Sequence, residues 1–580
     1  MSKLNIDQKT VKDLFSAKKT KFLIPDYQRP YAWEDDECQT LWEDLFNFSF
    51  PDNNCDNFDS DSNEYFLGPI VTFKNDDGDM EIIDGQQRLT TLMLLLRAFY
   101  DKFKNMEDDK SKKTRKQIEQ CLWKTDEFGD ADKSTLKIDS EVATDNDKDE
   151  FLDILRTGVV TGGKSTYAKN YKFFQDKITE FTEEYVSYTP LLPLRIMQNC
   201  ILLPIEAESQ DTALRIFSTL NDRGKPLSDA DIFKAQFYKY YSDKGQKETF
   251  IKKWKELEML CNSIFPSSSG SALDELFTRY MYYERAKKGI KSSTTEALRR
   301  FYERDGYILL KNDKTFENLI DLANFWNDVY DQNVERFSKD VLKRLYVLNY
   351  APNGMWTYFV SVYYIANRED NMLLDDEDFY QFLNKITAFI WTYAVINPGV
   401  NALRTPVYAE MINVVNKQPV TFEEFLFNAQ QVENKFRNFD FKNKRRITKS
   451  MLTWWAFQDP EQKYLPLEKK IDIEHIYAKN RQENEQGLTN SNNMDSLGNK
   501  SILEKNINIR ASDYRFSDKI KYYQGFTTSK GNKKEGTTIK ELLDLSNTVT
   551  DFTETDIEQR ETKIIREFIK YLKNNGLLNI

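Results

Sequence analysis

The chain of 580 residues contains one histidine, His475, within the segment IDIEHIYAKN. Glu474 precedes it directly, and Asp472 lies two residues before Glu474. An imidazole with a free pKa of roughly 6.5 suits a general base near neutral pH. Carboxylate oxygens are hard ligands that suit Mg²⁺ or Mn²⁺. Phosphodiester hydrolysis needs both functions, a base for the water and a cation for the leaving oxygen. An isolated histidine is more often structural, so its neighbours carry this interpretation.

Further oxygen donors follow in the segment LGNKSILEKNINIRASDYRFSDK. It supplies Asn499, Asn506 and Asn508, and then Lys519. Amide oxygens belong to the same class of hard ligand as carboxylates.

The alternation of side chains along a strand constrains how these groups can meet. In an extended strand, Asp472 and Glu474 would lie on one face and His475 on the other. A turn or bulge near His475 is therefore needed for them to converge. Whether Asp472 or Glu474 holds the metal stays open.

A second segment with chemical potential is MEIIDGQQRLTTL, where Gly85 lies at a predicted junction between a strand and a helix. Glycine permits close approach of the backbone to a ligand. The N-terminus of the following helix offers unpaired N–H groups to an anion, and Arg88 could bind a phosphate through two hydrogen bonds. The alternative is an ordinary tight turn, with Asp84 capping the helix and Arg88 in a surface ion pair.

Length and composition bound the scaffold that must position these groups. At 580 residues, roughly three to four domains are expected. The apolar fraction of 40% and aromatic fraction of 14% exclude a wholly disordered chain. The net charge of −11 gives no global attraction for nucleic acid, so DNA binding would need local basic patches.

Cellular location is also indicated by the sequence. The five cysteines are widely spaced without a C-x-x-C pair, which argues against a disulfide framework and a zinc ribbon. The N-terminus has no apolar region typical of a signal peptide, and no run approaches 18 apolar residues. We therefore expect a cytoplasmic protein with no membrane span.

The pattern along the first 240 residues predicts a mixture of strands and helices. A hairpin is expected where two apolar runs flank the acidic turn KNDDGD. The charged segment NMEDDKSKKTRK predicts a loop, and Ser228 is a candidate N-cap. A strand that runs into a turn is expected within 21–33, and further strands at 65–73, 80–85 and 199–209. The expected helices lie at 36–48, 87–103, 211–222 and 229–241.

From about 245 to 440 the pattern is almost entirely helical and rich in aromatics, which predicts a bundle interrupted at the segment PSSSGS. A basic segment, FKNKRRITKS (441–450), then opens a new unit. Such a charge run is often only a solvated face, but it could contact phosphate. The candidate DNA contacts are Lys444, Arg445, Arg446 and Lys519.

Three segments of the N-terminal part together resemble a known domain. IPDYQRPYAW, IIDGQQRLTTL and FSTLNDRGKPLSDADIFK occur in this order and resemble the ParB/sulfiredoxin-like domain of GmrSD-type restriction enzymes, which are type IV and modification-dependent. The resemblance implies that this domain binds and hydrolyses a nucleoside triphosphate and senses modified DNA. Ordinary aromatic packing is the alternative for Tyr27 and Tyr31. The implied nucleotide-binding residues are Asp84, Gly85, Gln86, Gln87, Arg88, Tyr27, Gln28 and Arg29, with Asn221, Arg223 and Gly224 as weaker candidates.

The C-terminal segments are similar to the HNH (ββα-metal) nuclease domain that accompanies this sensor domain. The resemblance makes His475 the general base, Glu474 the adjacent metal ligand and Asn499 the residue that orients the base region. Asn508 would be the late metal ligand, where classical members have His, with Asn506 as its competitor. Because the chain has no second histidine, the resemblance implies a site with one metal ion and an asparagine ligand. Two departures are present: alanine stands at 478 where the family has proline, and the acidic neighbour is Glu where many HNH enzymes have Asp.

The sequence as a whole predicts a mainly α, mixed fold in three domains. These are an α+β ParB/sulfiredoxin-like domain (1–240), a helical bundle (241–440) and a ββα-metal (HNH) nuclease domain (441–580). The expected function is that of a restriction endonuclease that cuts phage DNA, is dependent on a nucleoside triphosphate (GTP, ATP, CTP or UTP), and uses Mg²⁺ or Mn²⁺. Its partner would be double-stranded DNA modified by a glucosylated base or a phosphorothioate, and a homodimer is conceivable.

Two alternatives belong to other classes. The first is a DNA-binding nucleotide switch or regulator whose nuclease domain is degenerate, and nucleotide hydrolysis without any nicking of DNA would favour it. The second is a metabolic enzyme that uses the DGQQR segment as a small-molecule kinase site. It leaves the C-terminal cluster unexplained.

Overall fold

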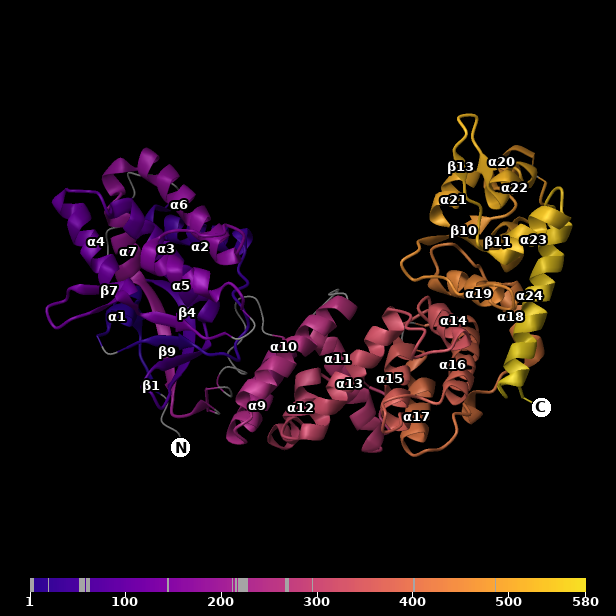
Figure 1. Ribbon diagram of the computed structural model, residues 1–580, viewed down its shortest axis with the longest axis horizontal. Helices are drawn as coiled ribbons and strands as arrows, with labels where there is room; N and C mark the ends of the chain where they lie inside the picture. The colour runs from indigo at the N-terminus through magenta and orange to yellow at the C-terminus, as the bar shows by residue number, and fades with distance from the viewer. Residues whose placement is uncertain are drawn as a thin grey trace. The chain divides into compact units, whose positions relative to one another are not determined.

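The computed structural model (Figure 1) describes residues 5–579 except 19, 52–57, 59–62, 143–144, 211, 214–215, 217–227, 266–270, 295, 400–401 and 486. The chain divides into two compact units, Met1–Glu256 and Leu257–Ile580. The expected mainly α, mixed fold is confirmed. None of the described helices combines the length and apolar character needed to cross a membrane.

The described part of the first unit contains a seven-stranded mixed sheet in the order β1-β9-β4-β5-β3-β8, with β2 pairing β9. The predicted hairpin is confirmed, because β4 and β5 pair antiparallel around the acidic turn. The predicted strand at 199–209 is also confirmed as β9, which runs parallel to β4. The strands are β1 (Asn5–Ile6), β2 (Lys9–Thr10), β3 (Phe22–Ile24), β4 (Tyr65–Lys74), β5 (Met80–Asp84), β8 (Ile138–Ser140) and β9 (Cys200–Ala207).

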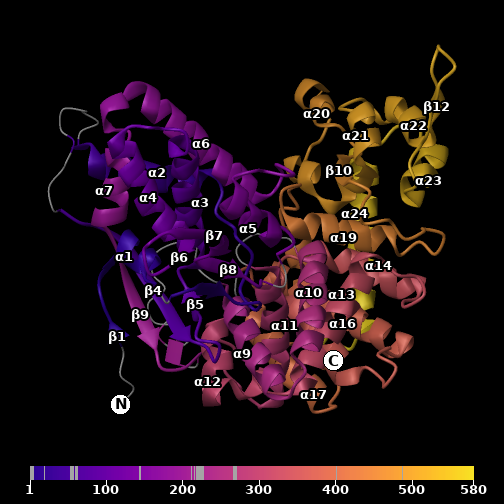
Figure 2. The ribbon, with the colours of Figure 1, turned by 60° about the vertical axis from the view of Figure 1, so that its left-hand side comes forward.

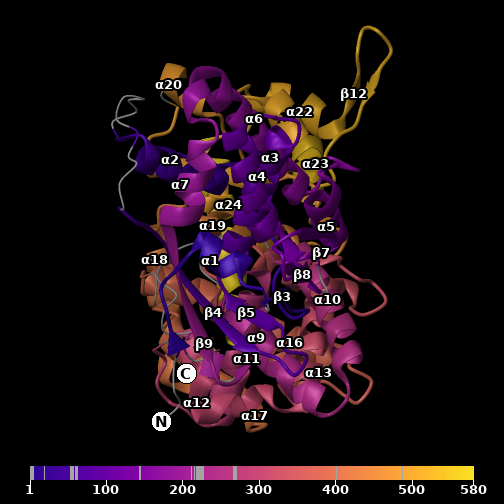
Figure 3. The ribbon, with the colours of Figure 1, turned by 90° about the vertical axis from the view of Figure 1, so that its left-hand side faces the viewer.

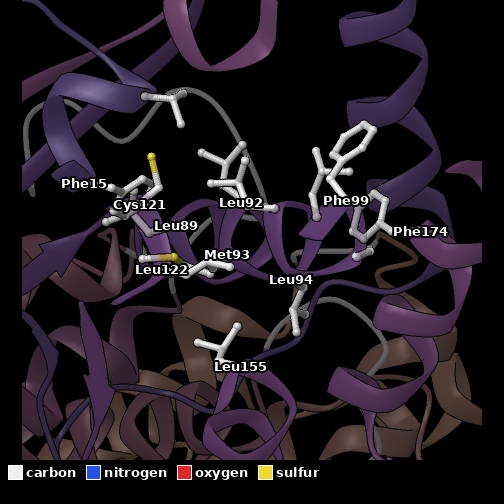
Figure 4. Close-up of a cluster of buried hydrophobic side chains, with 14 of the residues drawn as sticks. Phe15, Leu89, Leu92, Met93, Leu94, Phe99, Cys121, Leu122, Leu155 and Phe174 are labelled. Carbon is white, nitrogen blue, oxygen red and sulfur yellow. The ribbon is translucent and has the colours of Figure 1, made fainter. Parts of the chain in front are cut away.

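Helix α3 (Gln86–Phe103) forms the centre of the first unit's core. Its apolar residues are buried around the whole circumference, as expected of a helix enclosed by other elements. Figure 4 shows Leu92 and Leu94 leaving this helix in different directions, within a cluster that includes Phe174. The surrounding helices include α1 (Val11–Ser16), α2 (Asp35–Ser49), α4 (Asp109–Leu122), α5 (Lys148–Thr157), α6 (Thr166–Glu184) and α7 (Leu191–Asn199) (Figure 2).

The prediction of a loop at 105–116 was wrong, because α4 begins at Asp109. Asp108 caps its N-terminus by accepting a hydrogen bond from the backbone N–H of Ser111. Ser111 and Thr114 occupy core-facing positions that carry apolar residues in most helices. The apolar periodicity is therefore invisible in this half of the helix. A short hairpin, β6 (Trp123–Thr125) and β7 (Ala131–Leu136), follows.

Ser228 caps α9 (Asp229–Asp243), as predicted, through a capping box with Asp231. The helix predicted at 211–222 and most of the PSSSGS break lie outside the described residues. Cys38, Cys121, Cys200 and Cys261 are buried free thiols, and burial raises the pKa of each to about 12.

The second unit begins with the helical bundle predicted for 245–440, which is confirmed. Its core is aromatic: the rings of Phe389 and Phe422 stack with centroids 3.6 Å apart, and those of Phe325 and Tyr364 stack at 4.2 Å. The bundle and the C-terminal region belong to one compact unit, so the boundary at residue 440 stays a prediction. The helices are α10 (Lys247–Ile264), which crosses the unit boundary, α11 (Ala272–Lys287), α12 (Leu298–Tyr307), α13 (Asp313–Tyr330), α14 (Lys339–Leu348), α15 (Met355–Asn367), α16 (Asp376–Ile396), α17 (Arg404–Val415) and α18 (Ala429–Arg437).

The C-terminal region contains two antiparallel strands, β10 (Ile471–His475) and β11 (Lys500–Glu504), followed by α21 (Lys505–Ala511). This is the strand, strand, helix order that the sequence predicts. The other elements are α19 (Arg446–Ala456), α20 (Lys479–Glu485), α22 (Phe516–Gln524), β12 (Phe526–Thr527), β13 (Lys533–Lys534), α23 (Lys540–Thr548) and α24 (Glu554–Asn574).

Candidate functional site

His475 is the last residue of β10, and its side chain is 11% exposed. The ring nitrogen Nε2 is buried without a hydrogen-bond partner among the described residues. It lies 3.8 Å from Oδ1 of Asp495, so a small shift of either side chain would form a hydrogen bond. A carboxylate in this position can hold the proton on Nε2 and thereby fix the tautomer of the imidazole.

Lys500 lies directly opposite His475 in the strand pairing and is fully buried. Its Nζ donates to Oδ1 of Asp495 and to the carbonyl of Phe441, both at 2.6 Å. The lysine therefore fixes the carboxylate beside the imidazole. Sequence reasoning missed Asp495 and Lys500, although both flank the LGN segment that had been singled out.

This environment keeps the imidazole neutral. Burial, followed by the positive charges of Lys500 and Lys479, lowers the pKa of His475 to about 4, and Asp495 opposes the shift only in part. At neutral pH, the ring is therefore in the form that can accept a proton. Although burial acts against it, the hydrogen bond from Lys500 lowers the pKa of Asp495 and keeps it ionised.

Glu474 is committed to a different set of contacts. Its Oε1 accepts hydrogen bonds from Nζ of Lys519 and from the hydroxyl of Tyr523, both at 2.6 Å. The exposed fractions of the Glu474 and Lys519 side chains are 3% and 1%, so they form a buried ion pair. Nζ of Lys519 also donates to the carbonyl of His475 at 2.6 Å.

The pairing of β10 with β11 is regular, from Ile471 opposite Glu504 to His475 opposite Lys500. The bulge that would bring Glu474 to the imidazole is therefore absent from this described ladder, and the alternation of the strand keeps the two side chains on opposite faces. Lys519 lies inside the domain, so it would have to leave Glu474 before it could contact DNA.

Asn499 joins the two sides of the site. Its Oδ1 accepts from the backbone N–H of Tyr477 at 2.7 Å, and its Nδ2 donates to the carbonyl of the same residue at 3.2 Å. Its own carbonyl accepts from the N–H of Ile476 at 2.9 Å. These bonds fasten the chain just after His475, which is the geometry that an orienting residue needs.

Helix α24 also contacts the loop that precedes β11, through the side chain of Arg560. Nη1 of Arg560 donates to the carbonyls of Leu497, Gly498 and Lys500 at 2.7–2.9 Å. Its Nε and Nη2 donate to the two carboxylate oxygens of Glu541 at 2.7 and 2.8 Å. Sequence reasoning missed Arg560, because nothing in the local pattern relates it to the LGN segment.

The fit of these residues to a divalent cation depends on the remaining oxygen donors. Asp472 and Asn508 are half-buried, and neither side chain forms a hydrogen bond or ion pair in the described part of the chain, whereas Asn506 is exposed. No group of three His, Cys, Asp or Glu side chains gathers among the described residues. Mg²⁺ is commonly held by one or two carboxylates with phosphate and water. Asp472 and Asn508 therefore provide donors of the right kind.

The basic segment 441–450 leads into α19. Lys444, Arg445 and Arg446 are exposed, and NH2 of Arg446 donates to the carbonyl of Asn349 at 3.1 Å. Nζ of Lys449 binds the carbonyl of Ile471 at the start of β10. Arg446 is thus the first residue of a helix that contacts the strand carrying His475, and Lys444 and Arg445 lie just before this helix.

In the first unit, Gly85 forms the junction between β5 and α3 with φ of +90°, which favours glycine. Arg88, in the first turn of α3, donates to the carbonyl of Pro69 at 2.9 Å. Its guanidinium packs on Gly68, where a Cβ atom would lie 2.9 Å from Nη2. Gly68 was not identified from the sequence.

The structure brings the two predicted nucleotide-binding segments together. Gln28 donates to the carbonyls of Ile82 and Ile83, and Gln86 donates to the carbonyl of Arg29 at 3.4 Å. Gln87 bridges the same loop, because it accepts from the N–H of Ala32 at 2.7 Å and donates to the carbonyl of Pro30 at 3.2 Å. The glutamines thus hold the YQR loop against the DGQQR turn.

Three charged groups also lie near this turn: Asp84, Arg29 and Arg88. Burial raises the pKa of Asp84, and the N–H of Gly85 and the two arginines oppose the shift. The ring of Tyr27 packs against Tyr238 with centroids 4.8 Å apart. Asn221, Arg223 and Gly224 lie outside the described residues.

Two protein-family models match the chain, one over each of the two candidate sites. Residues 11–238 match the family model described as GmrSD restriction endonuclease, N-terminal domain, and residues 428–567 match the C-terminal domain of GmrSD restriction endonucleases. The chain belongs to the GmrSD restriction endonucleases. The N-terminal GmrSD match contains the DGQQR turn, and the C-terminal match contains His475 and the part of α24 up to residue 567. No curated protein matches the sequence. DNA is the partner that a GmrSD restriction endonuclease implies.

Proposed function

We propose that this GmrSD protein is a type IV endonuclease that cuts modified DNA in a manner dependent on a nucleoside triphosphate, as an antiviral defence in the cytoplasm. The observation that carries the proposal is the neutral, buried imidazole of His475 beside the Asp495–Lys500 pair. It occurs in a strand, strand, helix unit of the kind found in HNH nucleases.

In this proposal, His475 takes the proton from the attacking water. Asp495 would accept a hydrogen bond from Nε2–H after a small shift of either side chain, which leaves Nδ1 as the nitrogen that takes the proton from the water. Lys500 keeps Asp495 in place, and Asn499 fixes the backbone after His475. Asp472 and Asn508 would hold Mg²⁺ or Mn²⁺, which would stabilise the leaving oxygen. Because Asp472 lies on the strand face opposite to His475, β10 would have to bend near His475 for the metal and the base to reach the same phosphodiester. Glu474 could join only after releasing Lys519.

The N-terminal domain would bind and hydrolyse GTP, ATP, CTP or UTP. The α3 N-terminus at Gly85 supplies N–H groups for a phosphate, and Arg29 and Arg88 supply positive charge near it. The same domain would sense a glucosylated base or a phosphorothioate in double-stranded DNA. The proposal includes a homodimer, but none of its catalytic steps depends on a second subunit.

The test compares cleavage of glucosylated, phosphorothioate and plain DNA with Mg²⁺, with and without each nucleotide. We expect cleavage only of one modified DNA and only with nucleotide. A His475→Ala protein should bind DNA and hydrolyse nucleotide but not cut. Cleavage by this variant at the wild-type rate would remove His475 as the base, since no other histidine can replace it.

A specific observation keeps a second candidate function, a nucleotide-regulated DNA-binding switch with a degenerate nuclease. Glu474, the metal ligand implied by the family pattern, is bound to Lys519 and Tyr523 instead. Nucleotide hydrolysis that responds to DNA, with no nicking under Mg²⁺ or Mn²⁺, would select this candidate.

A further inference from the structure

A lysine-rich hairpin projects from the C-terminal region (Figure 3). Its strands, β12 and β13, pair Phe526 with Lys534 and Thr527 with Lys533. Lys530, at the tip, and the two β13 lysines are all exposed, and none forms an ion pair within the described part of the chain. The hairpin between Gly525 and Gly536 carries three exposed lysines and one acidic residue, Glu535, which lies at its base, although the whole chain has a net charge of −11.

The base of the hairpin is closely packed. Gly525 has φ of +83°, and a Cβ atom there would lie 2.7 Å from the backbone nitrogen of Gly536. A Cβ atom at Gly536 would lie 2.4 Å from the carbonyl oxygen of Tyr523. Both positions therefore require glycine. The two ends of the hairpin can approach each other more closely than residues with side chains would allow.

Each end of the hairpin is hydrogen-bonded to one strand of the candidate active site. Tyr523, just before the hairpin, donates its hydroxyl to Glu474 of β10 at 2.6 Å. Thr537, just after it, donates to Glu504 of β11 at 2.6 Å. Arg510 of α21 adds a hydrogen bond to the carbonyl of Glu535 at 3.0 Å. The basic hairpin is therefore held at a fixed place relative to His475.

We propose that this hairpin is a DNA-contacting arm whose three lysines, Lys530, Lys533 and Lys534, bind backbone phosphates beside the bond that is cut. This inference rests on the proposed nuclease function. Phosphate is the partner that fits, because the lysines have no anionic partner among the residues that the structure describes and their ammonium groups bind phosphate as point charges. A narrow two-stranded ribbon can also lie along a DNA groove.

The test measures binding of a fluorescein-labelled duplex of about 30 base pairs by anisotropy, in EDTA, between about 50 and 200 mM KCl. Each phosphate contact adds roughly −0.9 to the slope of log K against log salt concentration. The triple variant K530Q/K533Q/K534Q should therefore have a slope shallower by about 2–3 than that of the wild type. The matched control K287Q/K288Q/K291Q, which removes three exposed lysines from the bundle of the same unit, should keep the wild-type slope.

Thermal melting by circular dichroism establishes that both triple variants are folded. An unchanged slope in the hairpin variant would overturn the proposal, as would an equal change in the control. If polyglutamate binding depended on the hairpin while DNA binding did not, the surface would belong to an acidic protein partner. If the wild type cut DNA but the hairpin variant kept its slope, only this inference would fail. If the wild type neither bound nor cut DNA, both proposals would fail.

Discussion

At the scale of single residues, the imidazole of His475 can be observed without ambiguity, because it is the only one in the chain. We predict that its pKa, followed by NMR through the ring Cε1–H signal, lies near 4 and not near 6.5. Asp495→Asn should lower this pKa further, because the carboxylate favours the charged ring. A wild-type pKa near 6.5 would contradict the buried environment.

The same shift links His475 to stability. Since protonation is harder in the folded chain than in the unfolded one, the contribution of this group is present above pH 6.5. It is lost as the pH falls from about 6.5 to about 4, by about 3 kcal/mol in total. Urea unfolding of wild type and His475→Gln across this range measures the difference, and the glutamine variant should lack this part of the pH dependence.

Glu474 distinguishes a structural carboxylate from a metal ligand. Glu474→Gln leaves Lys519 buried without a counter-charge, which should cost about 3–5 kcal/mol of unfolding free energy even in EDTA. The double variant Glu474→Gln/Lys519→Met should recover much of this loss. A single variant that is stable in EDTA but binds Mn²⁺ more weakly would instead make Glu474 a ligand.

The sequence predicts His475 and Asn499 as site residues, because their spacing follows a known pattern, but it does not point to Asp495 or Lys500. Those two meet the imidazole only through the pairing of β10 with β11 and the fold of the loop between them. Glu474 has the expected residue type, but its partner, Lys519, comes from a helix whose docking no local pattern encodes.

At the scale of elements, the loop before β11 packs closely against the backbone of α24 at Gly498. A Cβ atom at Gly498 would lie 2.1 Å from the carbonyl oxygen of Ile557, which is rigid helix backbone. Gly498→Ala should therefore destabilise the protein by about 1–3 kcal/mol and reduce DNA cleavage more than DNA binding. The control Gly354→Ala meets no atom within 4 Å and has a negative φ, so it should change neither. Thermal melts and cleavage assays measure both effects. Equal effects of Gly498→Ala and Gly354→Ala would contradict a close contact between Gly498 and α24.

The elements that could be predicted are those with a strong pattern. The β4–β5 hairpin has apolar runs on both sides of an acidic turn, and α3 has a long apolar sequence that follows Gly85. Helix α4 escaped prediction because Ser111 and Thr114 take core positions, so its buried face does not read as apolar. Packing against α3 and its capping by Asp108 stabilise a helix that hydrophobic periodicity does not reveal.

At the scale of the whole molecule, two compact units predict two cooperative unfolding transitions. Gly85→Ala forces a side chain into a left-handed conformation and should lower only the transition of the first unit, by about 1–2 kcal/mol. Glu474→Gln should lower only that of the second. Differential scanning calorimetry of the intact chain tests this, and a single transition shifted by both variants would contradict it.

The contact between Arg560 and the LGN segment has a consequence for biosynthesis. The strands that carry His475 and Lys500 leave the ribosome before α24 (Glu554–Asn574) does, yet the loop between them is held by hydrogen bonds from that helix. In an unfinished polypeptide, the loop beside His475 therefore lacks its hydrogen bonds to α24. If cutting takes place at His475 under control of the N-terminal unit, as we propose, the order of synthesis would protect the producing cell's chromosome, because the site becomes complete only after the controlling unit has been made.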